Sequence, residues 1–218
     1  MATTSSTIKG YNAERYYIAT QGPMSITDEK QSNNHDCTIE DFWTMIWQQN
    51  VNCVVMLTEC IGELEKCDQY WPKEIDKTCQ YGNILIRLVD ILDKCTYIQR
   101  KMEIVVIGQK RSIYHLQFKN WRDFRAPQNT EHLIKFIQDI HQLKPSLPIV
   151  VHCSAGVGRT GVLIALDILL QKLKYEGDID IFKCIRTLRE QRFRMVQSFE
   201  QYLSLYQAIA FTIQTDII

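Results

Sequence analysis

Residues 149–161 read IVVHCSAGVGRTG, an apolar run followed by a loop of small residues. The loop contains Gly156 and Gly158 and no proline, so its backbone can adopt the turn angles that point several N–H groups at one centre and form an anion nest. The strongly apolar segment 160–173 is typical of a buried helix, whose N-terminus would add a partial positive charge at the same centre. The stretch therefore predicts a strand, an anion-binding loop and a helix.

Two side chains predict the chemistry of this loop. Arg159 can donate two hydrogen bonds to phosphoryl oxygens, and the positive field favours the thiolate form of Cys153, which is the nucleophilic form. A nucleophile inside an anion-binding loop indicates covalent phosphoryl transfer through a cysteinyl-phosphate intermediate. This chemistry requires no metal and no organic cofactor. The residues between the two side chains are the expected phosphate-binding residues: Ser154, Ala155, Gly156, Val157 and Gly158.

Three other interpretations of the loop are weaker. A nucleotide-binding P-loop needs G-x-x-x-x-G-K-[ST], but Cys153 stands five positions before Gly158 and Arg159 replaces the lysine. A buried, unreactive cysteine needs neither a glycine-rich turn nor an arginine beside it. A histidine such as His152 is more often a hydrogen-bonded core residue than a catalytic base, and we expect it to brace the loop.

Composition limits the class of protein. The chain has 218 residues, 45% hydrophobic and 23% charged, which is typical of one globular domain, here residues 1–218. Lys and Arg number 25, as do Asp and Glu, which argues against a nucleic-acid partner. No apolar run has the ~20 residues of a membrane span, and Met1–Ser6 lacks the features of a secretory signal. We therefore expect a cytoplasmic protein that does not act at a membrane.

The eight cysteines do not form a recognisable metal or disulfide pattern. No two are spaced as C-x-x-C, which argues against a zinc ribbon or a thioredoxin-like site. In a cytoplasmic protein the thiols should stay reduced. Cys53 and Cys184 lie in apolar patterns and are expected to be small buried core residues.

Hydrophobic spacing predicts the other elements. The turns Asp93-Lys94 and Gly108-Gln109-Lys110 separate alternating segments that are typical of antiparallel strands, and Thr38-Ile39-Glu40-Asp41 resembles a capping box. Strands followed by helices, with one strand–loop–helix unit among them, indicate an α/β (α+β) fold with a central twisted mixed β-sheet flanked by helices. We expect helices at 38–49, 130–143, 160–173, 178–191 and 198–213, and strands at 51–57, 83–90, 96–107, 112–118 and 149–151.

The sequence resembles the catalytic domain of classical, phosphotyrosine-specific protein tyrosine phosphatases. Their signature, H-C-x5-R followed by Ser or Thr, matches residues 152–160. The similarity extends from about Tyr11 to the C-terminus. Further segments match in family order: residues 17–23 (YIATQGP), 40–43 (EDFW), 66–72 (KCDQYWP), 121–123 (WRD) and 195–197 (MVQ).

This resemblance implies a role for each residue of the loop and its neighbours. Cys153 would attack phosphorus, and Arg159 would hold the phosphoryl oxygens in the transition state. Asp123 would protonate the departing tyrosine oxygen and then act as base on water. From sequence alone, Asp123 would be taken for a turn residue before Ala126-Pro127. Its position after Trp121, between strand and helix, favours a movable acid loop, with Trp121 among the substrate-binding residues.

The resemblance assigns further residues to the second half of the reaction. Gln197 resembles the glutamine that positions the hydrolytic water, and Gln201 would assist it. Thr160 would ease departure of the thiolate. Arg189 and Arg192 resemble residues behind and beside the pocket, although an exposed basic helix end is the alternative. The implied partners are phosphotyrosine-containing proteins.

The chain departs from the family in several places. Arg122 stands where the family has proline, which should alter loop closure and slow turnover. Aligned on Gly10-Tyr11, the chain begins too late to include the family's phosphotyrosine-recognition loop, so peptide affinity should fall. The polar segment 27–35 is unusually long and is expected to be a surface loop. The partner of Arg159 is open between Glu59 and Glu63. The shortened domain also resembles the phosphatases that parasitoid-wasp viruses (bracoviruses) deliver into host cells.

Three functions are compatible with these residues. The first is an active protein-tyrosine phosphatase, favoured by the set Cys153, Asp123, Arg159 and Gln197. The second is a catalytically weak module that binds or traps phosphotyrosine proteins, favoured by Arg122 and the absent recognition loop. The third is a phosphatase for a non-protein phosphate ester. We favour the first.

Overall fold

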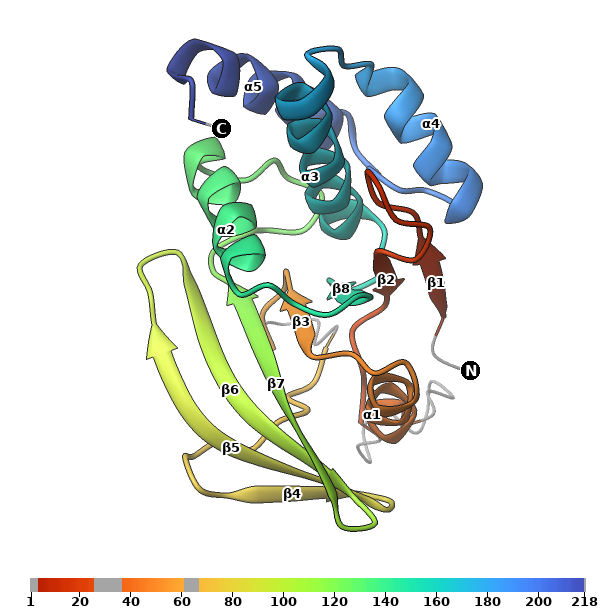
Figure 1. Cartoon of the computed structure of the whole chain (residues 1–218), viewed down its shortest axis with the longest axis vertical. Helices are drawn as coiled ribbons and strands as arrows, with labels where there is room; N and C mark the ends of the chain where they lie inside the picture. Colours follow the sequence, from red (N-terminus) through yellow and green to blue (C-terminus); the bar gives the residue numbers. More distant parts are fainter. Residues whose placement is uncertain (1–3, 26–36, 61–66, 218) are drawn as a thin grey trace.

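The computed structural model describes residues 4–25, 37–60 and 67–217. Its described strands form one eight-stranded mixed sheet (Figure 1). In sheet order they are β1 (Ser5–Ile8), β2 (Tyr17–Thr20), β8 (Ile149–His152), β3 (Cys53–Met56), β7 (Gln109–Phe118), β6 (Tyr97–Val106), β5 (Ile84–Asp93) and β4 (Thr78–Tyr81).

The centre of the sheet is parallel and its two ends are antiparallel. Strands β2, β8, β3 and β7 run parallel, with Ala19 and Val55 both opposite Val151 on β8. Every residue of β2, β3 and β8 is buried, as expected of parallel strands covered on both faces. Strand β8 is thus central, and the loop that follows it starts from a fixed position.

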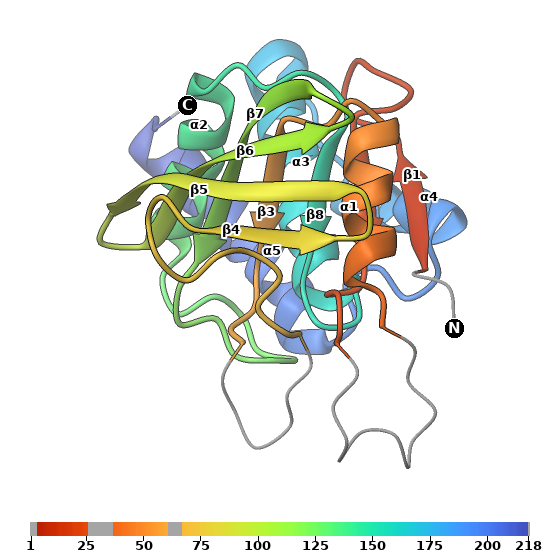
Figure 2. The same ribbon diagram turned by 90° about the horizontal axis from the view of Figure 1, so that it is seen from below.

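Helices cover both faces of the sheet. Figure 2 shows α1 on one side of β8 and β3, with α3 on the other. The buried side chains form two clusters, one shared by the sheet and α1, the other by the sheet and the remaining helices. The helices are α1 (Ile39–Gln48), α2 (Thr130–Gln142), α3 (Gly158–Glu176), α4 (Ile181–Gln191) and α5 (Phe199–Thr215).

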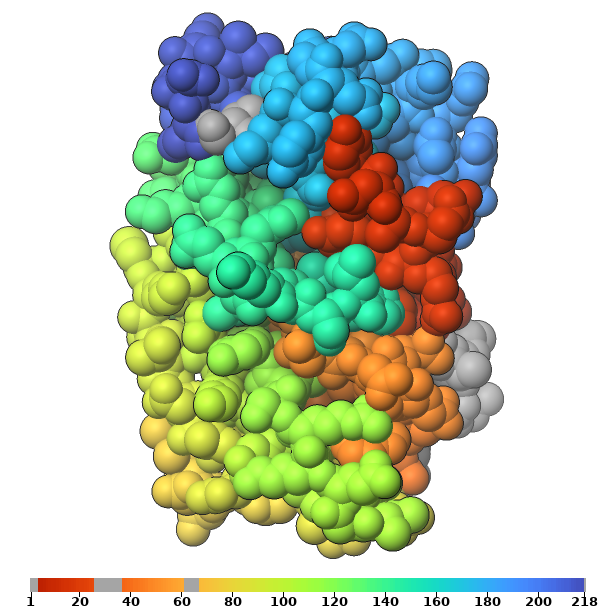
Figure 3. Space-filling view, viewed as in Figure 1, coloured from red at the N-terminus to blue at the C-terminus, as the bar shows by residue number. Residues whose placement is uncertain are grey.

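The N-terminal strand packs beside the helical layer. In the space-filling view the first residues (red) lie against those around residue 180 (blue) (Figure 3). The Lys9 amide donates to Oε1 of Gln191 at 2.7 Å, and Nη1 of Arg192 donates to Oγ of Ser6 at 3.1 Å. No helix in the described part of the chain combines the length and apolar character that a membrane span requires.

The predicted fold class is confirmed, as are all five predicted helices and five predicted strands, with shifted ends. Strands β1, β2 and β4 were not predicted.

The expected turn 108–110 is too long, because β7 already begins at Gln109. The capping box at Thr38 is wrong: its hydroxyl accepts from the Met24 amide at 3.0 Å instead of capping α1. Cys53 is buried, whereas Cys184 is only half-buried. The polar segment 27–35 lies outside the described residues.

Candidate active site

The loop from Cys153 to Val157 connects β8 to α3, and its backbone conformation requires glycine at one position. Gly156 has a φ of 68°, and a Cβ there would lie 2.1 Å from the Thr20 carbonyl oxygen. The Gly22 amide donates to the Ser154 carbonyl at 2.9 Å. The end of β2 and the residues that follow it therefore support this phosphate loop.

Arg192 also supports the phosphate loop, through the loop's backbone carbonyls. Its Nε donates to the Gly156 carbonyl at 2.7 Å, and its Nη2 donates to the Ala155 carbonyl at 3.2 Å. Because these carbonyls point outward to a cation, the amides of the same peptide units point inward, toward the anion nest. Arg192 is thus only part-exposed and contacts the phosphate loop, which agrees better with the family-based expectation than with an exposed basic helix end.

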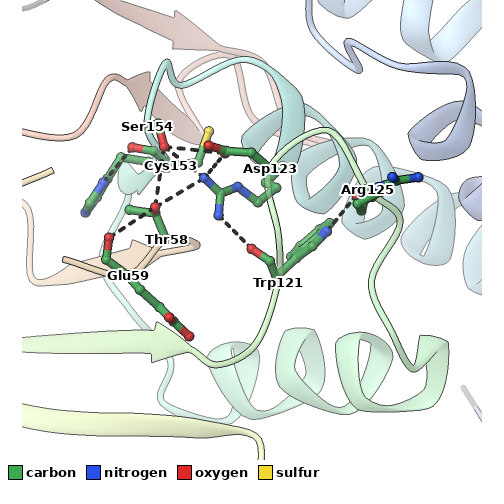
Figure 4. A network of polar contacts seen from close by, with 9 residues as sticks. Thr58, Glu59, Trp121, Asp123, Arg125, Cys153 and Ser154 are labelled. Carbon is green, nitrogen blue, oxygen red and sulfur yellow. Dashed lines mark hydrogen bonds and ion pairs between the residues drawn. The ribbon is translucent and has the colours of Figure 1, made fainter. Parts of the chain in front are cut away.

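Arg159 lies in the first turn of α3 and contacts four other residues. Figure 4 labels all four of these partners. The Arg159 side chain is only 4% exposed. It donates to the Trp121 carbonyl at 2.7 Å, to Ser154 Oγ at 2.9 Å and to Thr58 Oγ1 at 3.2 Å, and it pairs with Asp123 Oδ1. Among the described residues, Asp123 is the one carboxylate that forms an ion pair with Arg159. The guanidinium is thus held in a fixed plane.

The acid loop, residues 121–127, is held by contacts at its start and at its tip. Trp121 Nε1 donates to the Arg125 carbonyl at 2.9 Å, so the loop folds over its own tryptophan. Ser198 Oγ donates to the Phe124 carbonyl at 2.6 Å, and Arg125 pairs with Glu200 at 2.6 Å. Asp123 accepts from Ser154 Oγ at 3.4 Å and reaches the phosphate loop. The acid loop is therefore closed over Arg159.

A loop between α4 and α5 brings Gln197 to the same place. The Arg189 guanidinium donates to the carbonyls of Met195 and Val196 at 2.9 and 2.8 Å, and the Val196 amide donates to the Val157 carbonyl at 3.1 Å. Gln201 Oε1 accepts from the Gln197 amide at 2.9 Å. Gln201 thus positions Gln197 and completes a capping box on α5 with Ser198, a role that sequence reasoning did not assign to it.

These elements enclose one cavity of about 230 Å³. It is lined by Asp123, Phe124, Cys153, Ser154, Ala155, Gly158, Arg159, Gln197 and Gln201. Four predicted residues lie outside this lining, and one of them is Gly156 in the phosphate loop. Trp121 is buried with its ring against Phe118, at the start of the acid loop. Val157 accepts backbone hydrogen bonds at the start of α3, and Thr160 is buried beneath the loop.

Comparison with known proteins agrees with this geometry. A family model described as "Protein-tyrosine phosphatase" matches residues 4–211. The chain belongs to the protein-tyrosine phosphatase family. It is 41% identical over 211 residues to receptor-type tyrosine-protein phosphatase F of Danio rerio, covering 93% of this chain and 10% of that protein.

Two further relatives give the same result. Tyrosine-protein phosphatase 69D of Drosophila melanogaster is 38% identical over 92% of this chain and 14% of its own length. Receptor-type tyrosine-protein phosphatase S of Gallus gallus is 40% identical over 93% of this chain and 13% of its own length. The chain thus spans about a tenth to a seventh of the length of these three relatives.

Behind the phosphate loop, this phosphatase-family domain has a buried chain of polar side chains that was not foreseen. Tyr70 Oη is hydrogen-bonded with His152 Nε2 at 2.6 Å and with His115 Nε2 at 2.8 Å. Burial lowers the pKa of His152 to about 4, and burial with the nearby Arg100 lowers that of His115 well below its usual value. His152 is therefore neutral at pH 7. Its Nδ1 is hydrogen-bonded with the Cys153 carbonyl at 3.3 Å, which is the kind of contact expected of a residue that braces the loop.

Two other residues complete the surroundings of Arg159. Glu59, one candidate partner of Arg159, instead accepts from the Asn120 amide at 3.2 Å, at the start of the acid loop. The other candidate, Glu63, lies outside the described residues. Thr58 was missed as a partner of Arg159, and its position two residues after the end of the buried strand β3 was the available signal. The described residues contain no group of three side chains suited to hold a metal ion.

Proposed function

We propose that this domain hydrolyses phosphotyrosine in proteins through a cysteinyl-phosphate intermediate, with residues 1–218 acting as one catalytic domain. The observation that carries the proposal is the convergence of Cys153, Asp123, Arg159 and Gln197 on one cavity beside an anion-binding loop. A nucleophile, an acid, an oxyanion partner and a water-positioning amide are what a two-step phosphoryl transfer needs.

In the first step, the Cys153 thiolate attacks phosphorus. The S–P bond forms as the bond between phosphorus and the tyrosine oxygen breaks, and Asp123 gives its proton to that oxygen. Arg159 and the inward-pointing amides of the phosphate loop stabilise the negative charge on the equatorial oxygens. The proton is needed because a phenolate is a poor leaving group at neutral pH.

In the second step, water attacks the cysteinyl phosphate. Gln197 orients the water, and Asp123, now a carboxylate, accepts its proton. The S–P bond breaks, releasing phosphate and the Cys153 thiolate. The Thr160 hydroxyl is buried and has no hydrogen-bond partner within the described residues, so it is available to the departing sulfur. A small rearrangement of the loop would bring the two together and also remove the cost of an unsatisfied hydroxyl.

Because Asp123 is paired with Arg159, the phosphoryl group must displace Asp123 from Arg159 before Asp123 can act as the acid. A phosphoryl group on Arg159 accepts the hydrogen bonds that Arg159 otherwise donates to the carboxylate, so Asp123 must leave before it can protonate the tyrosine oxygen. The acid loop therefore opens and recloses in each turnover. Arg122, exposed in this loop, lacks the fixed φ of the family's proline, and we expect slower reclosure.

The test is hydrolysis of a phosphotyrosine peptide and of a small aryl phosphate, with Cys153→Ser as control. Release of phosphate from both, abolished in the variant, is the expected result. Release from the aryl phosphate alone would favour a non-protein phosphate ester as the substrate. Peptide binding without release from either would favour a phosphotyrosine-binding module, for which the Asp123–Arg159 pair would be a resting state.

Three finer expectations accompany this proposal. Phosphotyrosine-containing proteins are the partners that the chemistry of the cavity fits. A cytoplasmic location and a relationship to the phosphatases of parasitoid-wasp viruses both stay predictions.

A further inference from the structure

A second hollow adjoins the catalytic cavity, between α4 and α5. This groove has a volume of about 490 Å³ and shares Gln197 with the catalytic cavity. It is lined by Phe182, Ile185, Arg186, Arg189, Gln197, Ser198, Phe199 and Tyr202. The α4 members are spaced i, i+3, i+4 and i+7, so one face of that helix forms one wall.

The groove is apolar on the inside and aromatic at its edges. Ile185 is buried at its floor, while Phe182 and Phe199 are 65% and 75% exposed, one on each helix. Single exposed apolar side chains are ordinary, but two exposed phenylalanines facing one hollow expose a continuous apolar surface. Neither phenylalanine contributes to the catalytic cavity, so the proposed reaction does not account for them.

The charge of the groove is positive. Arg186 and Arg189 line it, and no carboxylate does. Glu190 is 3.9 Å from Arg186, and Glu200 is paired with Arg125, outside the groove. Arg189 is held by the carbonyls of Met195 and Val196, so its charge stays in place. This surface complements an acidic chain segment better than a basic one.

We propose that the groove binds the segment of a substrate protein that flanks the phosphotyrosine, through one large apolar side chain of an acidic sequence. The inference rests on the proposed function. Because Gln197 borders both hollows, a chain whose phosphotyrosine enters the catalytic cavity passes directly over the groove. An extended chain covers ~3.4 Å per residue and the two hollows share Gln197, so we expect the apolar residue within about four positions of the phosphotyrosine. The groove is thus a specificity site.

The experiment measures binding, so it does not depend on turnover. Fluorescent acidic phosphotyrosine peptides, each with one Leu at a position from four before to four after the phosphotyrosine and Ala elsewhere, are titrated into Cys153→Ser protein. Leu at one or two neighbouring positions should lower Kd about fivefold to tenfold. Phe182→Ala in the same background should abolish that gain and leave the Kd of the all-Ala peptide within twofold.

Two comparison variants make the result specific. Ile107→Ala removes an apolar side chain that is 91% exposed on the β6–β7 turn, far from the groove, and should keep the full preference for Leu (Figure 1). Phe199→Ala removes the second edge of the groove and should repeat the effect of Phe182→Ala.

Several results would overturn the proposal. One is a Kd that does not depend on the position of Leu. Another is a preference for Leu that survives both phenylalanine variants. A third is a dimer in sedimentation that Phe182→Ala dissociates, because a second copy of the chain would then occupy the groove. Failure of the proposed function would be seen separately, as absence of Cys153-dependent phosphate release from the same peptides by the unsubstituted protein.

Discussion

The phosphate loop and the acid loop both reach Arg159, but they are held by different kinds of contact. The phosphate loop packs against β2 and is braced by Arg192 through backbone carbonyls. The acid loop is held at its tip by exposed groups, since Phe124 is 54% exposed and the Arg125–Glu200 pair lies in solvent. Exposed ion pairs contribute little free energy, whereas buried backbone contacts resist local opening. The comparison indicates a rigid anion site beside a movable acid.

The largest expected effect is on the acid itself. Asp123→Asn keeps an oxygen acceptor for Arg159 and removes the proton donor, so kcat for a phosphotyrosine peptide should fall about 10²- to 10⁴-fold. Steady-state kinetics with aryl phosphates of increasingly acidic phenols should show a smaller loss, since those phenolates leave without a proton. An equal loss for every leaving group would mean that Asp123 only supports the loop.

The next effect tests the rigidity of the phosphate loop. In Gly156→Ala the new methyl group meets the Thr20 carbonyl oxygen at 2.1 Å, so the loop must shift and kcat/KM should fall at least about a hundredfold. Gly108→Ala is the matched control: its φ is 75°, with nothing within 4 Å of the new methyl group. It should cost about 1–2 kcal/mol of stability and leave kcat/KM unchanged. Similar kinetics for both variants would show that the loop tolerates displacement.

A third effect concerns the buried histidines behind the phosphate loop. The pKa of His152 is lowered to about 4 from the ~6.5 of an unfolded chain, so the unfolded state binds more protons as the pH falls between these values. Between pH 6.5 and pH 5 the free energy of unfolding should therefore fall by about 1.6 kcal/mol through His152 alone, which is ~15-fold in the folding equilibrium. His115, whose pKa is also lowered, adds to the loss.

His141 should change the free energy of unfolding with pH in the opposite direction to His152. Its hydrogen bond to Asp167, at 2.8 Å, raises its pKa, so its contribution is present below the unfolded value and is lost as the pH rises through the raised one. Urea unfolding of His141→Asn should therefore show a steeper loss between pH 7 and pH 5 than the unsubstituted domain. Stability that does not change over this range would mean that His152 and His115 are not buried as neutral groups.

The smallest expected effect is on the contact that closes the acid loop. Glu200→Gln removes the charge that pairs with Arg125, and kcat should change only about twofold, with the difference disappearing in high salt. Glu190→Gln is the control, because it removes an exposed carboxylate that faces Arg186 and does not touch the acid loop. If Glu200→Gln reduced kcat a hundredfold, the acid loop would be as tightly held as the phosphate loop.

The part of the site within one continuous segment could be predicted from sequence. Cys153, the loop glycines and Arg159 lie between a strand and a helix that hydrophobic spacing indicates directly. Residues that reach the site from distant segments could not be predicted in the same way. Thr58 becomes a partner of Arg159 only because β3 lies beside β8, and Arg192 faces the loop only because α4 packs on α3.

The fold shows the same limit. Ten-residue strands such as β5 and β6 were indicated by alternation, while β1, β2 and β4 have only four residues each and depend on pairing with distant strands. A capping box was expected at Thr38, but its hydroxyl binds the Met24 amide, because a tertiary contact outweighs the local cap. The capping box that does form, at Ser198 on α5, was not predicted. The role of Gln201 was likewise hidden until the loop that carries Gln197 was placed.

The most direct test of the account is a rapid-quench experiment with a phosphotyrosine peptide that carries radiolabelled phosphate. The account predicts a burst of tyrosine product equal to the enzyme concentration, with label recovered on the peptide fragment that contains Cys153. Gln197→Ala should increase the labelled fraction by slowing attack by water, and Cys153→Ser should give neither burst nor label. Phosphate release without label on Cys153, or label on another residue, would contradict the account.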